Sequence, residues 1–424
     1  MDNKINIREM VVEMLLEVVR TGTHSHILLK QVLDKYNYIP ESDRAWIRRV
    51  FTGTMERLIS IDHSIDTYSS VKAAKMKPFI RCLMRMSVYQ ILYMDRVPDR
   101  AAIDEAVKLA KKHKFASLAG FVNAVLRKIS AEKANIDYND HEIRYSVPKL
   151  IEDSLIKDYG NEIAEKILEE SLKESHLFVR IREDIIDADV EKITGEWKRE
   201  NIVFRNAALS YAYELTGTEG LDRLACFKEG LYAVQDIASM MVCECAGIKK
   251  GDKVIDVCAA PGGKSLHAVS KGAIVEARDI SAYKTGLIEE NIKRMRADNI
   301  SVKVWDATVF DETACEKADV LLADVPCSGL GVMSRKPDIK LNASKESWDS
   351  LEKLQRQIVD SVWNYVKKGG IMIYSTCTLR KAENEERVRY IIDNHPFKLL
   401  EEKTYYPCDD NGGFFIAKLE RIDG

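Results

Sequence analysis

From Asp252 onward, the chain alternates short apolar runs with helical stretches, and no other feature of the sequence constrains the fold as strongly. Alternation of this kind predicts a parallel sheet with helices packed on both faces. The apolar runs predict five strands, at Lys253 to Cys258, Ala273 to Asp279, Ile300 to Trp305, Asp319 to Asp324 and Gly370 to Ser375. Because ligands of such sheets bind at the carboxyl ends of the strands, the residues that follow these runs are candidates for a functional site.

The remainder of the chain predicts two further units, which makes the protein multi-domain. Residues 1–138 carry apolar stripes at helical spacing, with helices expected to begin after Pro40 and Pro98, and predict an all-α bundle. Residues 139–225 mix helices with strand-like runs at Leu177 to Ile181 and Ile202 to Phe204, and predict a small α/β connector. The parallel-sheet domain then occupies residues 226–424.

Composition narrows the class of protein. An apolar fraction of 46% and a charged fraction of 31% predict a chain of 424 residues that folds throughout. The apolar stretch from Met10 to Val19 is broken by Glu13 and Glu17, so we expect neither a signal peptide nor a membrane span, and we expect a cytoplasmic protein. The nine cysteines include no CxxC pair, which favours reduced thiols and no metal site.

Charge is distributed unevenly along the chain. The net charge is −3, yet residues 1–140 contain 23 Lys and Arg against 17 Asp and Glu. Runs of charge are usually solvated helix faces, so this basic excess favours nucleic-acid binding only modestly.

A glycine turn follows the first predicted strand, in the sequence Asp256-Val-Cys-Ala-Ala-Pro-Gly-Gly-Lys-Ser265. A glycine turn that leads into a helix lets the backbone approach a ligand closely, which predicts a nucleotide-type cofactor. The spacing fits neither the phosphate loop of ATP and GTP enzymes nor the GxGxxG of NAD enzymes. Acidic residues end successive strands at Asp256, Asp279 and Asp306; each alone would be an ordinary cap, but together they favour a ligand site.

These motifs resemble those of the RNA cytosine-C5 methyltransferases, which carry DxCAAPGGKS, DVPCSG and STCT; the resemblance spans roughly residues 225–424. It implies a Rossmann-like domain that binds S-adenosyl-L-methionine. It further implies that Asp279 holds the ribose, that Asp306 lies near the adenine amino group and that Asp324 closes the pocket. The turn along the methionine part would consist of Cys258, Ala259, Ala260, Pro261, Gly262, Gly263 and Lys264.

Two cysteines end neighbouring strands, Cys327 and Cys377. Carbon 5 of cytosine is a poor nucleophile until a thiolate adds to carbon 6, and either cysteine could supply that thiolate on spacing alone. The resemblance implies that Cys377 attacks and that Cys327 assists release. We expect Asp324 to contact the N3 and N4 edge of the base and Lys264 to lie near the reacting centre.

The N-terminal stretches Pro98-Asp-Arg-Ala-Ala-Ile-Asp-Glu-Ala-Val107 and Gly120-Phe-Val-Asn-Ala-Val-Leu-Arg127 resemble the NusB-like RNA-binding domain. Its combination with this catalytic domain is similar to the methyltransferases of the small ribosomal subunit. It implies an unpaired cytosine of 16S ribosomal RNA as the substrate, no membrane partner and a monomer.

Two other functions stay open at this point: a tRNA cytosine-C5 methyltransferase and a non-catalytic RNA-binding or ribosome assembly factor. One basic segment also has two interpretations. Residues Gly329 to Lys340, with Arg335 and Lys336, could hold RNA phosphates or form a solvated loop.

Overall fold

The computed structural model describes residues 5–173, 176–218, 220–407 and 412–423. Contacts between Cα atoms divide the chain into two units. The helical unit comprises residues 1–153, 171–173 and 333–342, and the sheet unit comprises residues 154–170, 174–332 and 343–424. The domain boundaries expected at residues 138 and 225 stay predictions. In the part of the chain that is described, no helix has both the length and the apolar character needed to cross a membrane.

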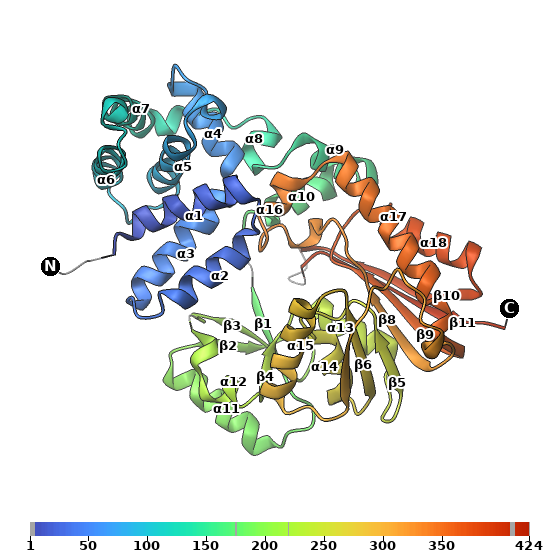
Figure 1. Cartoon of the computed structure of the whole chain (residues 1–424). Coiled ribbons are helices and arrows are strands. Elements are labelled where there is room, and N and C mark those ends of the chain that lie inside the picture. The colour runs from blue at the N-terminus through green and yellow to red at the C-terminus, as the bar shows by residue number, and fades with distance from the viewer. Residues whose placement is uncertain (1–4, 174–175, 219, 408–411, 424) are drawn as a thin grey trace. The chain divides into compact units, whose positions relative to one another are not determined.

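The helical unit confirms the expected all-α bundle (Figure 1). Its central helix is α5, which packs against α1, α3, α4, α6 and α7 and buries most of its side chains. Helix α3 crosses α5 so closely that a Cβ added at Gly53 would lie 2.1 Å from Tyr89 Oη. The helices are α1 (Ile7–Thr21), α2 (Ser25–Lys35), α3 (Glu41–Glu56), α4 (Leu58–Tyr68), α5 (Pro78–Tyr93), α6 (Asp99–Lys112), α7 (Ala119–Glu132), α8 (His141–Tyr145) and α16 (Asp338–Asn342).

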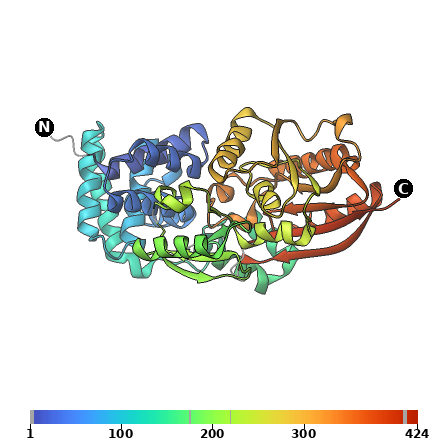
Figure 2. The same ribbon diagram turned by 90° about the horizontal axis from the view of Figure 1, so that it is seen from below.

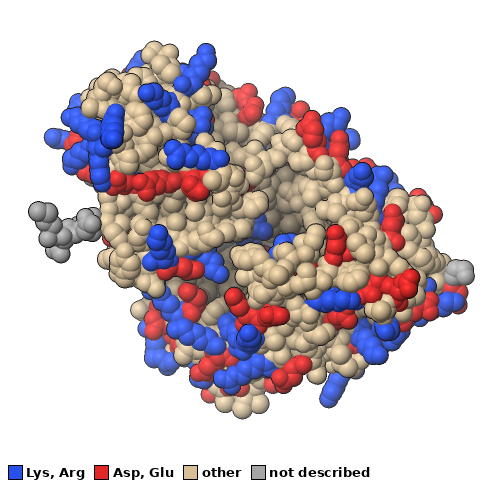
Figure 3. Space-filling view, viewed as in Figure 1, with Lys and Arg blue, Asp and Glu red and all other residues tan. Residues whose placement is uncertain are grey.

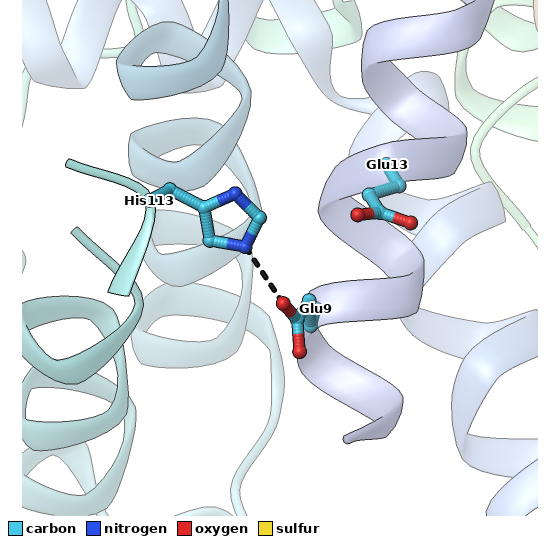
Figure 4. Close-up of side chains that lie close together, drawn as sticks. All are labelled: Glu9, Glu13 and His113. Carbon is cyan, nitrogen blue, oxygen red and sulfur yellow. Dashed lines mark hydrogen bonds and ion pairs between the residues drawn. The ribbon is translucent and has the colours of Figure 1, made fainter. Parts of the chain in front are cut away.

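An ion-pair cluster fastens the first helix of the bundle to the end of the sixth. Figure 4 shows Glu9 and Glu13 on α1 facing His113, which follows α6. Glu9 Oε1 lies 2.7 Å from His113 Nε2, and Glu9 Oε2 accepts a hydrogen bond from Lys112 Nζ at 2.6 Å. Burial raises the pKa of Glu9, but the hydrogen bonds from Lys112 and His113 lower it, and the net direction is downward. Glu9 therefore stays ionised and supports the packing of α1 on α6.

The sheet unit contains a seven-stranded sheet with the order β10-β11-β9-β8-β5-β6-β7 (Figures 1 and 2). Strands β5 to β9 are parallel and match the five expected strands within a few residues at each end. The strands are β5 (Lys253–Asp256), β6 (Ile274–Asp279), β7 (Ile300–Val304), β8 (Ala318–Asp324), β9 (Val366–Thr376), β10 (Phe397–Tyr405) and β11 (Phe414–Arg421).

The five expected strands are parallel, as predicted, but the sheet also contains two strands that the sequence did not predict. Strand β11 pairs antiparallel with β9, and β10 pairs antiparallel with β11, so the sheet is mixed. Strand β10 is one of the two edge strands and exposes most of its residues, including Lys398, Glu401 and Lys403. Charged residues on an edge strand prevent pairing with other chains, and they also remove the apolar pattern by which a strand is recognised.

Helices cover both faces of the large sheet, and alternate residues of β8 face opposite layers. Leu321 and Ala323 belong to the core formed with α17 and α18, whereas Val320 and Leu322 belong to the core formed with α13 and α14. This period of two is the burial expected of a central strand covered on both sides. The helices of this unit are α10 (Asn161–Glu170), α11 (Asp187–Arg199), α12 (Ala225–Lys228), α13 (Ile237–Ala246), α14 (Gly263–Ser270), α15 (Ala282–Met295), α17 (Lys345–Val362) and α18 (Glu385–Asn394), while α9 (Lys149–Tyr159) spans the boundary between the two units.

The same unit contains a second, four-stranded antiparallel sheet with the order β2-β3-β1-β4. Three of its strands lie in the segment expected to be a small α/β connector, and β4 follows that segment. Its strands are β1 (Leu177–Ile181), β2 (Val203–Asn206), β3 (Ala212–Thr216) and β4 (Tyr232–Val234). Helix α11 packs on this sheet through Trp197, which is fully buried among Tyr213 and Tyr232. Large aromatic side chains supply much of the buried apolar area that holds so small a layer together.

Candidate active site

The glycine turn after β5 has a backbone that requires glycine at one position. Gly262 has a φ of +101°, which L side chains rarely adopt, and it precedes the first residue of α14. A Cβ added at Gly262 would lie 3.1 Å from Ile288 Cγ2 on α15. At Gly263 the nearest atom to such a Cβ is 3.9 Å away, which is ordinary contact. The turn is thus shaped by Gly262 and leads the backbone past the ends of β5 and β6.

Asp256, the last residue of β5, bonds to the helix that follows this turn. Its carboxylate is 1% exposed and accepts a hydrogen bond from Ser265 Oγ at 2.6 Å. Burial raises the pKa of Asp256 to about 7. The residue does not line the cleft described next, so its role is to hold the start of α14 in place.

A cleft runs along the carboxyl ends of β5 to β9 and is lined by seven of the residues expected at the site, which are Cys258, Ala260, Asp279, Asp306, Asp324, Cys327 and Cys377. The other expected residues, Ala259, Pro261, Gly262, Gly263 and Lys264, are not among the lining. The lining also contains residues that sequence reasoning missed, among them Ile280, Lys284, Trp305 and Leu354. Ile280 follows Asp279 and Trp305 precedes Asp306, so their positions beside strand-end acids could have identified them as lining residues.

The two acids at the β6 and β7 ends are fixed by backbone donors. Asp279 accepts hydrogen bonds from the backbone N–H of Ala260 at 3.0 Å and of Ile280 at 2.8 Å. Asp306 accepts from the backbone N–H of Thr308 at 2.9 Å and from the hydroxyl of the same residue at 2.7 Å. Carboxylates held in this way keep a single orientation at the edge of the cleft, which suits recognition of hydroxyl or amino groups.

The two cysteines lie in contact. Cys327 Sγ and Cys377 Sγ are 3.3 Å apart, and both side chains are partly exposed to the cleft. The hydrogen bond with Cys377, together with burial, raises the pKa of the Cys327 thiol well above its ordinary value. Cys327 therefore keeps its proton at neutral pH and can donate it to the sulfur of Cys377.

Next to the sulfurs, Lys264 and Asp324 form a partly buried ion pair. Lys264 Nζ lies 2.7 Å from Asp324 Oδ2, and Ser375 Oγ donates to Asp324 Oδ1 at 2.9 Å. Burial lowers the pKa of Lys264, but Asp324 raises it more strongly, so the net direction is upward and the ammonium stays charged. The pair presents a fixed carboxylate and a cation beside Cys377, which also contributes to the raised pKa of Lys264.

The loop that follows Cys327 passes tightly against the start of β11. The backbone N–H of Gly331 donates to the carbonyl of Cys377 at 3.0 Å, and Gly413 N–H donates to the carbonyl of Gly331 at 2.8 Å. A Cβ added at Gly331 would lie 1.9 Å from the carbonyl oxygen of Gly413. Glycine at both positions allows two backbones to meet beside the cysteines.

The interpretation of Lys340 as a phosphate ligand was wrong. Lys340 lies on α16 within the helical unit and is 1% exposed, with its Nζ 3.5 Å from the carbonyl of Tyr145. Burial lowers its pKa to about 7. Helix α16 is anchored by Asp338 Oδ2, which accepts from the N–H and hydroxyl of Ser25 at 2.9 and 2.7 Å. A side chain enclosed in this way is not available to RNA in solution.

Charge on the surface of the helical unit is mixed. Figure 3 shows Lys and Arg side chains gathered over the helices at the upper left, with a band of Asp and Glu beside them. On the face that Figure 3 shows, the basic side chains of this unit therefore lie beside acidic ones.

Comparison with known proteins places both parts of the chain. The family described as "16S rRNA methyltransferase RsmB/F" matches residues 246–420, and the NusB family matches residues 5–131. The chain is 33% identical over 406 residues to a probable ribosomal RNA small subunit methyltransferase B from Bacillus subtilis, which covers 93% of this chain and 89% of the relative. It is 28% identical to ribosomal RNA small subunit methyltransferase B from Cronobacter sakazakii, over 99% of each chain.

Solved structures show the same fold. The crystal structure of PH0851 superposes with a TM-score of 0.83 at 23% identity and covers 98% of this chain and 99% of its own. That of NSun6 from Pyrococcus horikoshii, solved with SFG, has a TM-score of 0.57 at 22% identity and covers 65% of this chain and 99% of its own.

Fold and site together define a Rossmann-like methyltransferase that carries an N-terminal NusB domain. More closely, the chain belongs to the family of ribosomal RNA small subunit methyltransferase B.

Proposed function

We propose that this protein methylates carbon 5 of an unpaired cytosine in 16S ribosomal RNA, through a temporary bond between Cys377 and carbon 6 of the base. The observation that carries the proposal is the contact of Cys327 and Cys377, 3.3 Å apart in the cleft that also contains Asp279, Asp306 and Asp324. The relatives named for 16S or small-subunit ribosomal RNA support the substrate.

The hydrogen-bonding groups that line the cleft suit S-adenosylmethionine. Asp279 and Asp306 are oriented acceptors at neighbouring strand ends, and Cys258 and Ala260 of the turn line the same cleft. A nucleoside needs such acceptors for its ribose hydroxyls and its amino group. When bound, the cofactor supplies an electrophilic methyl group.

The two sulfurs have different tasks in this proposal. Cys377 Sγ bonds to carbon 6 of the cytosine, which makes carbon 5 nucleophilic. Cys327 keeps its proton in the free enzyme because of its bond with Cys377. Once Cys377 is bonded to carbon 6, its sulfur no longer shares the proton of Cys327, and Cys327 can lose that proton to solvent. The Cys327 thiolate then takes the proton from carbon 5 of the methylated base, and Cys377 leaves carbon 6 as a thiolate.

Ionisation of the thiol contributes little to the rate. A thiol with a pKa of about 8.5 is roughly 3% ionised at pH 7, so full ionisation would gain at most about 30-fold. Positioning the base between the sulfur and the methyl donor can contribute far more, about 7 kcal/mol or above. Asp324, fixed by Lys264 and Ser375, would bind the amino edge of the base and favour cytosine over uracil.

The test uses purified protein, methyl-labelled S-adenosylmethionine and an unmodified 16S rRNA transcript, with bisulfite sequencing of the product. We expect label in the RNA and one cytosine protected from bisulfite conversion. Transfer to tRNA but not to 16S rRNA would show that the proposed substrate is wrong. Label in RNA without a protected cytosine would show that the proposed product is wrong. No transfer to any RNA would favour the assembly factor.

A further inference from the structure

The structure contains a buried carboxylate beside the cysteine pair that the proposed chemistry does not use. Glu383 is 0% exposed and lies between the end of β9 and the start of α18. Its Oε2 accepts hydrogen bonds from the backbone N–H of Ser328 at 2.9 Å and from Gln355 Nε2 at 2.9 Å. Its Oε1 accepts from the hydroxyl of Ser328 and from Arg380 Nη1, the latter at 2.9 Å. Two of the four donors therefore belong to the residue that follows Cys327.

The neighbouring residue, Asn384, bonds to the two residues that flank the other cysteine, Cys377. Asn384 Oδ1 accepts from Thr376 Oγ1 at 2.6 Å, and Asn384 Nδ2 donates to the carbonyl of Thr378 at 3.1 Å. Thr376 and Thr378 flank Cys377 in the sequence. Adjacent side chains on one short segment thus fix the backbones on which the two sulfurs are mounted.

A direct bond joins the two sides. Ser328 Oγ and Thr378 Oγ1 are 2.6 Å apart, so the residue after each cysteine contacts the residue after the other. Gln355 adds a second support for the Cys327 loop, because its Nε2 also donates to the carbonyl of Pro326 at 3.0 Å. The contact of 3.3 Å between the sulfurs is the outcome of these restraints.

We propose that Glu383 is a positioning residue, which holds Cys327 at the place from which it releases Cys377 from the methylated base. The inference rests on the proposed function and deepens it. Glu383 restrains the Cys327 side, whereas Asn384 restrains the Cys377 side. Loss of Glu383 should therefore slow the release step more than the formation of the adduct.

The energetics support an effect of measurable size. A buried carboxylate with four donors leaves several of them without a partner when it is changed, and hydrogen bonds to charged groups are stronger than neutral ones. In Glu383→Gln an NH2 group replaces one of the two oxygens, and at either position it would face donors: Arg380 and the Ser328 hydroxyl at Oε1, or Gln355 and the Ser328 backbone N–H at Oε2. The Cys327 loop would have to shift to relieve that conflict, whereas β9 stays paired with β8 and β11.

The experiment compares Glu383→Gln, Ser328→Ala and Asn384→Ala with the wild type in a single assay. Each protein is incubated with S-adenosylmethionine and the 16S rRNA transcript, and the RNA–protein adduct that survives denaturing gels is measured beside the methylated product. For Glu383→Gln we expect the ratio of adduct to product to rise about tenfold, the size expected when a bond to a charged group is lost. Ser328→Ala, which keeps the carboxylate and its bonds to Arg380 and Gln355, should show a smaller rise. Asn384→Ala should lower both quantities.

Glu386→Gln is the matched control, because Glu386 is exposed on the first turn of α18, three residues from Glu383. It should leave the ratio unchanged. Misfolded protein cannot accumulate adduct, so a rise in adduct reports on folded enzyme. If Glu383→Gln is unstable, the rise expected for Ser328→Ala still tests the proposal. If adduct and product fall together in both Glu383→Gln and Ser328→Ala, the positioning role of Glu383 is wrong, and the proposed function is not affected.

Cys327→Ala and Cys377→Ala in the same assay test the proposed function separately. Adduct in Cys327→Ala and none in Cys377→Ala support it. Adduct or product that persists in Cys377→Ala would overturn the proposed function, and the role of Glu383 with it.

Discussion

The two halves of the cleft are built by different means. At β5 and β6 the geometry is local: Gly262 shapes the turn, and Asp279 is fixed by the backbone of Ala260 and of its own neighbour Ile280. At β8 and β9 the geometry depends on residues far apart in the chain, such as Ser328 with Glu383 and Gly331 with Gly413. The half at β5 and β6 can therefore be recognised from a short motif, whereas the contacts of the half at β8 and β9 form only when the chain has folded.

The largest expected effect lies in the cysteine half. Cys377→Ala should lower methyl transfer by more than about 10⁴-fold, because removal of a covalent nucleophile leaves only binding and positioning. The measurement is label transfer to the 16S rRNA transcript under saturating S-adenosylmethionine. Cofactor affinity, followed by calorimetry, should stay near the wild-type value, and a large loss of affinity would show that the two halves are not separable.

A pair of glycine substitutions compares the backbones of the two halves. Gly331→Ala should reduce the free energy of unfolding by about 3 kcal/mol, since its Cβ would lie 1.9 Å from the carbonyl oxygen of Gly413. Gly263→Ala, whose Cβ meets nothing closer than 3.9 Å, should change it by less than about 0.5 kcal/mol. Urea unfolding measures both. Equal losses in the two variants would contradict the close approach described for Gly331.

Asp256, in the half at β5 and β6, should make the free energy of unfolding depend on pH. Burial raises its pKa to about 7 in the folded protein, so at pH 5 the folded state keeps a proton that the unfolded state has lost. Stability from this group is therefore present at low pH and lost as pH rises through about 7. Between pH 5 and 7 the wild type should lose about 2 kcal/mol relative to Asp256→Asn. A difference that is flat or rises with pH would refute the raised pKa.

The smallest expected effect concerns Asp279. Asp279→Asn keeps the shape of the side chain but removes the charge, and it should weaken S-adenosylmethionine binding by about tenfold. Adduct formation in the Cys327→Ala background should be unaffected at saturating cofactor, because Asp279 belongs to the local half of the cleft. A loss of adduct that excess cofactor cannot restore would instead couple the two halves.

Sequence reasoning succeeded where the signal is local. Apolar runs located β5 to β9, and Pro40 and Pro98 marked the starts of α3 and α6. It failed for the β10 edge strand, whose charged residues conceal the pattern, and for Lys340, because a lysine in a loop gives no sign of burial until α16 has packed.

The candidate site divides in the same way. The strand-end acids and the two cysteines could be placed at one edge of the sheet, because parallel strands bring their carboxyl ends together. The neighbours of those residues could not be predicted. Glu383 stands 55 residues after Ser328 in the chain, and a contact at that separation leaves no periodicity to detect.

Helix α16 has a consequence for any attempt to separate the domains. Residues 333–342 follow the Cys327 loop directly, yet they pack within the helical unit, where Asp338 is bonded to Ser25. A protein cut at residue 225 would therefore expose Lys340 to solvent and leave Asp338 without Ser25. A replacement for the N-terminal module would therefore have to supply donors for the Asp338 carboxylate and a buried place for Lys340.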